Sequence, residues 1–125
     1  MNLPEDLKYT EEHEWVRVEN DHLLIGITDY AQGELGDIVF IELPTNNDKF
    51  DKSSSFGTVE AVKTVSDLYM PISGIVVEVN EDLETSPELI NEDPYVSGWI
   101  IKVKPDNIND INDLLDANKY KEIIS

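Results

Sequence analysis

The chain of 125 residues contains no cysteine and only two histidines. Without cysteine there is no disulfide, no thiolate zinc site and no cysteine nucleophile. The histidines, His13 and His22, stand nine positions apart with no third one to complete a set, which is poor spacing for metal ligands. We therefore expect no metal site. Any sulfur redox chemistry would have to come from a group attached to the protein.

Positive charge is also scarce. Nine Lys and Arg residues face 27 Asp and Glu residues, which gives a formal net charge of −18. Phosphate backbones and anionic membrane surfaces are bound mainly through Lys and Arg, so we expect neither nucleic acid nor membrane as a partner. An acidic surface keeps a protein soluble, and it also favours encounter with basic surfaces on partner proteins. Repulsion between like charges favours a monomer.

Long apolar runs and targeting signals are missing as well. No run approaches the roughly 20 residues of a membrane span. Residues 1–6 lack the cationic and apolar regions of a signal peptide, and they are acidic where a transit peptide would be rich in Arg. We expect a cytoplasmic protein, or a mitochondrial matrix protein whose transit peptide has been removed. The length and a hydrophobic content of 40% predict one folded domain over residues 1–125.

Recognisable catalytic motifs are absent too. The sequence has no Gly-x-Ser-x-Gly elbow, no phosphate-binding glycine loop and no zinc-binding histidine helix. Carboxylates are so abundant that pairs of them arise by chance. We therefore expect no catalytic residues, and an enzyme acting on its own is an alternative without a supporting motif.

What the chain does contain is a series of short segments with β-type alternation, separated by turn residues. The first two form a hairpin around Asn20-Asp21, with Val16 and Val18 on one face. In the strand at 75–79, Ile75, Val77 and Val79 are expected to point inward. The predicted strands are 13–19, 22–27, 38–43, 58–62, 64–69, 75–79 and 99–104, with an exposed loop at 48–55.

Helical signals are fewer. Residues 28–36 predict a short helix capped by Thr28 or Asp29 and ended by Gly36. One helical turn is expected at 85–88, and an amphipathic helix at 107–124 that breaks near Asp116. Many short strands followed by a helical tail predict an all-β dominated fold, a small barrel or sandwich with short helices and a C-terminal helix.

One lysine stands apart from its surroundings. Between Ser53 and Ile101 there are nine carboxylates and a single cation, Lys63. It lies where the segments 58–62 and 64–69 meet, so we expect it at the tip of a hairpin. A lone turn lysine is usually no more than solvated. A primary amine at a tight turn is nevertheless well placed for modification by another enzyme.

The sequence around this lysine resembles a known family. Phe56 to Tyr69, read as FGTVEAVKTVSDLY, is similar to the lipoylation segment of the glycine cleavage system H proteins. Further segments resemble the same family in order and spacing, so that the resemblance runs from about residue 9 to residue 120. These segments are HEWV at 13–16, GITDYAQ at 26–32, LGDIVFIELP at 35–44, PISG at 71–74 and PELIN at 87–91.

This resemblance implies a flattened β-barrel of the lipoyl- and biotinyl-domain type, a barrel-sandwich hybrid. It implies that Lys63 carries lipoate in amide linkage, which changes the formal charge from −18 to −19. The implied task is to carry the aminomethyl group of glycine from a pyridoxal-phosphate glycine decarboxylase to a tetrahydrofolate-dependent aminomethyltransferase. A flavin dihydrolipoamide dehydrogenase would then reoxidise the carrier with NAD, and a lipoylating enzyme would modify it.

The resemblance also carries roles for other residues. Glu14 and Asp67 match positions at which the family holds the loaded arm, and Glu12 is a further candidate. Glu60, three residues before the lysine, matches the pattern read by the lipoylating enzyme. Gly74 is expected to be structural, with the positive φ that turns need.

Three alternative functions also use a modified lysine. The first is a lipoyl donor that passes lipoate to 2-oxoacid dehydrogenases, and the second is a divergent H-like protein outside glycine catabolism. A biotin carrier is the third alternative, but Val62-Lys63-Thr64 stands where biotin carriers have Met-Lys-Met.

Overall fold

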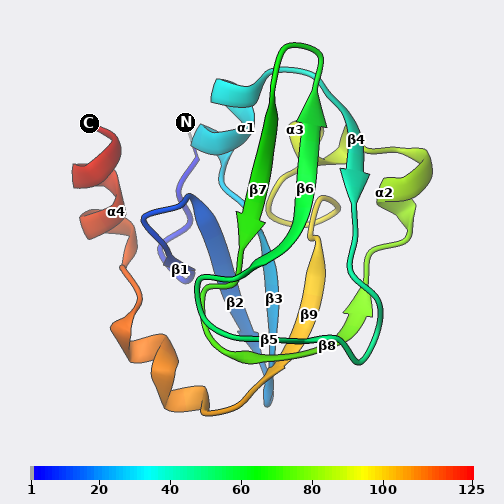
Figure 1. The fold of residues 1–125 in the computed structure, drawn as a ribbon. Coiled ribbons are helices and arrows are strands. Elements are labelled where there is room, and N and C mark those ends of the chain that lie inside the picture. Colours follow the sequence, from blue (N-terminus) through cyan, green and yellow to red (C-terminus); the bar gives the residue numbers. More distant parts are fainter. Residues whose placement is uncertain (1) are drawn as a thin grey trace.

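Two antiparallel β-sheets form most of the structure. The computed structural model describes residues 2–125. The larger sheet has the strand order β1-β2-β3-β9-β8-β5, and the smaller sheet has the order β4-β6-β7. Figure 1 shows the β6–β7 hairpin in front of β2, β3 and β9, with its turn projecting at one end of the molecule. The predicted flattened barrel or sandwich is therefore confirmed.

The elements follow the predicted order closely. The strands are β1 (Lys8–Tyr9), β2 (Glu14–Glu19), β3 (His22–Ile27), β4 (Ile38–Glu42), β5 (Lys49–Phe50), β6 (Ser55–Ala61), β7 (Val65–Tyr69), β8 (Gly74–Val79) and β9 (Ile101–Pro105). The helices are α1 (Asp29–Leu35), α2 (Asp82–Thr85), α3 (Leu89–Glu92), the 3₁₀ helix η1 (Ile108–Asp113) and α4 (Ala117–Ile124). No helix within residues 2–125 is long and apolar enough to cross a membrane.

Apolar side chains from both sheets meet in one core. The alternating residues of β3 point inward as predicted, and each strand of the smaller sheet also contributes buried apolar side chains. Members of this core include Leu23, Ile25, Ile27, Ile41, Val59, Leu68, Val76, Ile101 and Val103. A second cluster, rich in aromatic side chains, lies beneath α4 and contains Tyr9, Trp15, Tyr95 and Tyr120. The two clusters fix the larger sheet from both of its faces.

The predicted capping and helix-ending residues do lie at the ends of the helices. The Thr28 hydroxyl accepts a hydrogen bond from the Ala31 N–H at 3.2 Å, and Gly36 ends α1 with φ of 81°. The predicted C-terminal helix is two pieces, η1 and α4. Asp116 separates them by capping α4 through the Lys119 N–H at 2.8 Å, which confirms the predicted break.

Three predictions on the smaller elements are wrong. Residues 48–55 are not only a loop, because β5 pairs with β8 through Lys49 opposite Ile75 and Phe50 opposite Gly74. Of the predicted helical turn at 85–88 only Thr85 is helical, as the last residue of α2, and α3 begins at Leu89. On β8, Val76 is fully buried while its neighbours Ile75 and Val77 are half-buried, the reverse of the prediction.

Two residues also differ from their predicted roles. Val18 shares the inward alternation of Val16 but is 44% exposed, because it lies near the free end of the β2–β3 hairpin. Gly74 does not have a positive φ. It lies within the β8–β9 pairing, where a Cβ would come within 2.7 Å of the Lys104 carbonyl oxygen. Close approach of a neighbouring strand is therefore what requires glycine there.

Candidate functional site

Lys63 lies at the tip of the β6–β7 hairpin. The Ala61 N–H donates to the Thr64 carbonyl at 2.8 Å, which closes the turn. The Val62 N–H donates to the Asp37 carbonyl at 3.1 Å and ties the turn to the residue before β4. Lys63 itself is exposed, and among the described residues no carboxylate forms a salt bridge with it. A rigid backbone thus presents a free primary amine to solvent.

A cleft of about 280 Å³ lies beside this hairpin, between α1 and β7. The two elements stand next to each other in Figure 1. The lining of the cleft includes four carboxylates, Glu12, Glu14, Glu34 and Asp67, and no Lys or Arg. Apolar side chains of both sheets and of α1 complete the wall, among them Ile27, Ala31, Leu35, Val59 and Leu68. Such a cleft suits a ligand with an apolar stem and a positively charged end.

Glu14 is the deepest of these acids. Its side chain is only 1% exposed, and its carboxyl group accepts hydrogen bonds from the Thr10 hydroxyl at 2.7 Å and the Tyr69 N–H at 3.4 Å. Burial raises the pKa of Glu14 to about 8, although these two hydrogen bonds act in the opposite direction. With this pKa the group is mostly protonated at pH 7. A cation bound beside it would favour the charged carboxylate.

The other predicted site residues fall into two groups. Asp67 is exposed on β7 and accepts a hydrogen bond from the Tyr69 hydroxyl at 3.5 Å, and Glu12 is exposed at the cleft. Glu60 is not part of the cleft lining. It is exposed in β6, where it stands opposite Phe40 on one side and Val65 on the other. The structure thus brings Glu12, Glu14 and Asp67 together and leaves Glu60 elsewhere.

Comparison with known proteins identifies the family. A model of the glycine cleavage H-protein family matches residues 7–125. The chain belongs to this family. It is 60% identical to the glycine cleavage system H protein of Staphylococcus carnosus over 99% of this chain and 98% of the relative. It is 54% identical to the H protein of Bacteroides fragilis over 100% and 99% of the two chains.

A solved structure supports the same assignment. The crystal structure of a glycine cleavage system H protein from Mycobacterium marinum matches with a TM-score of 0.88 and 38% identity, over 95% of this chain and 96% of that one. The glycine cleavage H-protein family thus accounts for both the sequence and the fold, and the predicted resemblance is confirmed.

In this H-protein family member the cleft contains residues that sequence reasoning did not select. Tyr30 and Glu34 line it from α1, and His13 lines it from the loop before β2. Tyr30 and Glu34 are four residues apart, so a helix places them on the same face, and that spacing was a usable signal. His13 was considered only as a metal ligand.

A hydrogen-bonded chain supports the cleft from behind. Nδ1 of His13 lies 2.8 Å from the Tyr120 hydroxyl, which lies 2.7 Å from the Thr28 hydroxyl. His13 has φ of 72° and packs against Tyr30 with 5.1 Å between the ring centroids. Burial lowers the pKa of His13, which keeps the imidazole neutral near pH 7. The C-terminal helix therefore helps to shape the cleft wall through Tyr120.

Proposed function

We propose that this chain is the lipoyl carrier of the glycine cleavage system, with lipoate attached to Lys63 through an amide. The observation that carries the proposal is an exposed, unpaired lysine at the β6–β7 turn of a glycine cleavage H-protein. The acid-lined cleft fits as well, because an apolar arm with an amine at its end matches its apolar walls and carboxylates. The whole of residues 1–125 would act as one carrier unit without a catalytic cycle of its own.

The proposed partners follow from this role. Glycine decarboxylase with pyridoxal phosphate supplies the aminomethyl group, the tetrahydrofolate-dependent aminomethyltransferase receives it, and dihydrolipoamide dehydrogenase with FAD and NAD restores the oxidised carrier. Bound lipoate would supply the dithiol chemistry that a chain without cysteine lacks. A tethered arm also raises the effective concentration of its end at each active site.

The residues of the chain perform three tasks in this proposal. The closed β6–β7 turn holds Lys63 away from the body of the molecule, where other enzymes reach it. Glu14 and Asp67, with Glu12 beside them, bind the amine end in the cleft and shield it from water. Glu60, exposed three residues before the lysine, is read by the lipoylating enzyme.

We also propose a cytoplasmic location, because the relatives named above come from bacteria. A monomer remains the proposed state, since each copy carries a net charge of −18.

Replacing Lys63 tests the function. Protein made in a lipoylating host should carry the mass of one lipoyl amide, and Lys63→Arg should lack it and lose glycine-dependent turnover in the reconstituted system. Lys104→Arg, at an exposed lysine on β9, is the matched control and should keep both. Intact-mass spectrometry, the turnover assay and circular dichroism are the measurements. Full turnover by a folded Lys63→Arg protein would end the proposal.

A further inference from the structure

Exposed apolar side chains gather around the lysine-bearing turn. Eight large hydrophobic residues are exposed within residues 2–125, and four of them lie here. We call these four, Val39, Phe40, Val62 and Val65, the apex patch. Val39 and Phe40 are each 52% exposed, Val62 69% and Val65 60%. Apolar residues concentrated at one end of such an acidic protein indicate an interaction surface.

A β-bulge creates half of this patch. Ile38 stands opposite Ala61 and Phe40 opposite Glu60, so Val39 is an extra residue without a partner in β6. Ile38 and Ile41 are buried on either side, while both residues between them face solvent. A regular strand would have turned one of the two inward. Bulges of this kind re-aim side chains, and this one presents two apolar groups beside the turn.

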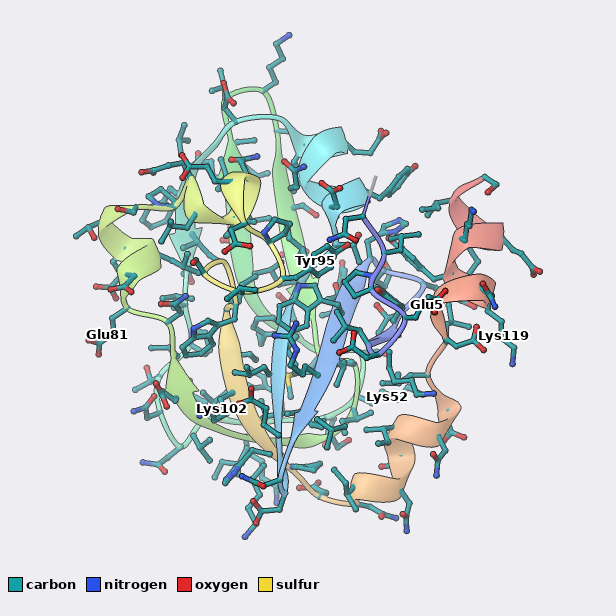
Figure 2. All side chains as sticks on the ribbon, turned by 180° about the vertical axis from the view of Figure 1, so that it is seen from behind. Glu5, Lys52, Glu81, Tyr95, Lys102 and Lys119 are labelled. Carbon is teal, nitrogen blue, oxygen red and sulfur yellow. The ribbon has the colours of Figure 1, made fainter. Side chains whose placement is uncertain are left out.

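The patch continues along the outer face of the smaller sheet. Phe40, Glu60 and Val65 are direct neighbours across β4, β6 and β7, so a carboxylate lies between two apolar side chains. From Phe40 an open groove of about 640 Å³ runs between β4 and α2. Leu43, Pro44 and Val79 contribute apolar lining, and Glu42, Glu81 and Glu84 contribute acids. Figure 2 shows Glu81 at the outer margin of the molecule.

The carboxylates around the apex patch and its groove indicate which kind of protein surface can bind there. Glu42, Glu60, Glu81 and Glu84 surround apolar groups, and the cation at the apex, Lys63, loses its charge on acylation. A second copy of this chain would bring its own net charge of −18 to the same place, which opposes self-association. The complementary surface has an apolar recess rimmed by Lys or Arg.

We propose that the apex patch and its groove dock the active-site entrance of the enzyme that loads or unloads the aminomethyl group on the Lys63 arm, through an apolar recess rimmed by Lys or Arg. The proposal rests on the proposed carrier function. Any such enzyme has to close over the β6–β7 turn, and Phe40 with the valines surrounds that turn. An aromatic anchor inside a polar, charged rim is the usual composition of an interface centre.

The test uses the full-length lipoylated protein and the substitution pair Phe40→Ser and Val65→Ser, singly and together. Val96→Ser is the matched control, because Val96 is 63% exposed but lies outside the patch. The KM for the carrier is measured in the decarboxylase reaction and in the aminomethyltransferase reaction. We expect the double variant to raise the KM about tenfold or more in at least one of them, as loss of interface anchors does, with kcat unchanged. The control should stay within about twofold of the parent protein.

Unchanged KM in both reactions, for a double variant with a parent-like circular dichroism spectrum, overturns the proposal. So does a concentration-dependent dimer in sedimentation that the double variant abolishes, because the patch is then covered by a second copy. Failure of the carrier function looks different, since it leaves Lys63→Arg active or the parent protein without lipoate. Docking can therefore be refuted while the carrier role stands.

Discussion

At the scale of single residues, Glu14 has the most unusual environment. Its carboxyl group is 1% exposed, and burial raises its pKa to about 8. In the proposed function this residue contacts the amine end of the loaded arm. Because an adjacent cation favours the ionised form, docking of an ammonium group would expel a proton from Glu14. The cleft would thus respond to the charge of what enters it.

The burial of Glu14 also predicts how stability depends on pH. Its pKa is raised on folding from 4.5 to about 8, so the folded protein binds more protons than the unfolded chain between these values. Stability from this residue is therefore present below about pH 4.5 and lost as pH rises toward 8. Glu14→Gln removes the titration, and the decline in the free energy of unfolding between pH 5 and pH 8 should become shallower.

Urea unfolding of both proteins at several pH values measures this difference. Each unit of pKa shift corresponds to about 1.4 kcal/mol, so the change in slope is large enough to detect. Equal pH dependence in the two proteins would show that Glu14 ionises normally.

At the scale of elements, the β-strands pack closely where glycine permits it. A Cβ on Gly74 would come within 2.7 Å of the Lys104 carbonyl oxygen, whereas a Cβ on Gly33 in α1 would meet nothing within 4 Å. Gly74→Ala should therefore destabilise the protein by about 1–3 kcal/mol through overpacking. Gly33→Ala should stabilise it by about 0.5–1 kcal/mol, because alanine favours the helix. Denaturant midpoints at constant m-value check both, and a neutral Gly74→Ala would contradict the assigned close approach.

The Tyr120 hydroxyl group helps to join helix α4 to the cleft. Tyr120→Phe removes the oxygen that lies between His13 and Thr28, and it should cost about 1–3 kcal/mol because polar groups lose a partner in a buried setting. Tyr69→Phe is the control, since its hydroxyl bonds to an exposed carboxylate at 3.5 Å, and it should change stability by less than about 0.5 kcal/mol. Thermal unfolding of both variants provides the comparison, and equal midpoints would deny Tyr120 this role.

At the scale of the whole molecule, the net charge of −18 is the dominant property. Self-repulsion of the folded chain weakens as salt shortens the Debye length from about 30 Å at 0.01 M to about 10 Å at 0.1 M. The unfolding midpoint should rise with NaCl over this range, while kcat/KM with a basic partner enzyme should fall. Calorimetry and carrier kinetics at matched ionic strengths test the pair of trends. A midpoint that fell with salt would mean that attractive charge pairs outweigh the repulsion.

Much of this architecture could be predicted from the sequence because its signals are local. Alternation placed Leu23, Ile25 and Ile27 in the core, and Thr28, Gly36 and Asp116 marked helix ends. Most of the errors came from long-range pairing. The β5–β8 pairing and the close approach at Gly74 depend on strands distant in sequence, and the irregular β8–β9 register at Val77 turns Val76 inward.

The same division holds for the site. Lys63 was evident because a hairpin is a local structure, and Glu14 and Asp67 were selected by family resemblance. His13, Tyr30 and Glu34 join the cleft only when α1 packs beside β7, and Tyr120 reaches His13 across 107 positions of the chain. The spacing of Tyr30 and Glu34 shows that they share a helix face, but no pattern within a short window shows which cleft that face meets.

The β6–β7 hairpin carries Lys63 at its turn and also supplies Val59, Ser66 and Asp67 to the cleft wall. In the proposed function, the attachment point of the arm and part of the cleft that binds its end therefore belong to the same hairpin. Bending of these two strands on contact with a partner would displace Lys63 and this part of the cleft wall together. The distance between them would then stay the same, so the arm could still reach this part of the cleft.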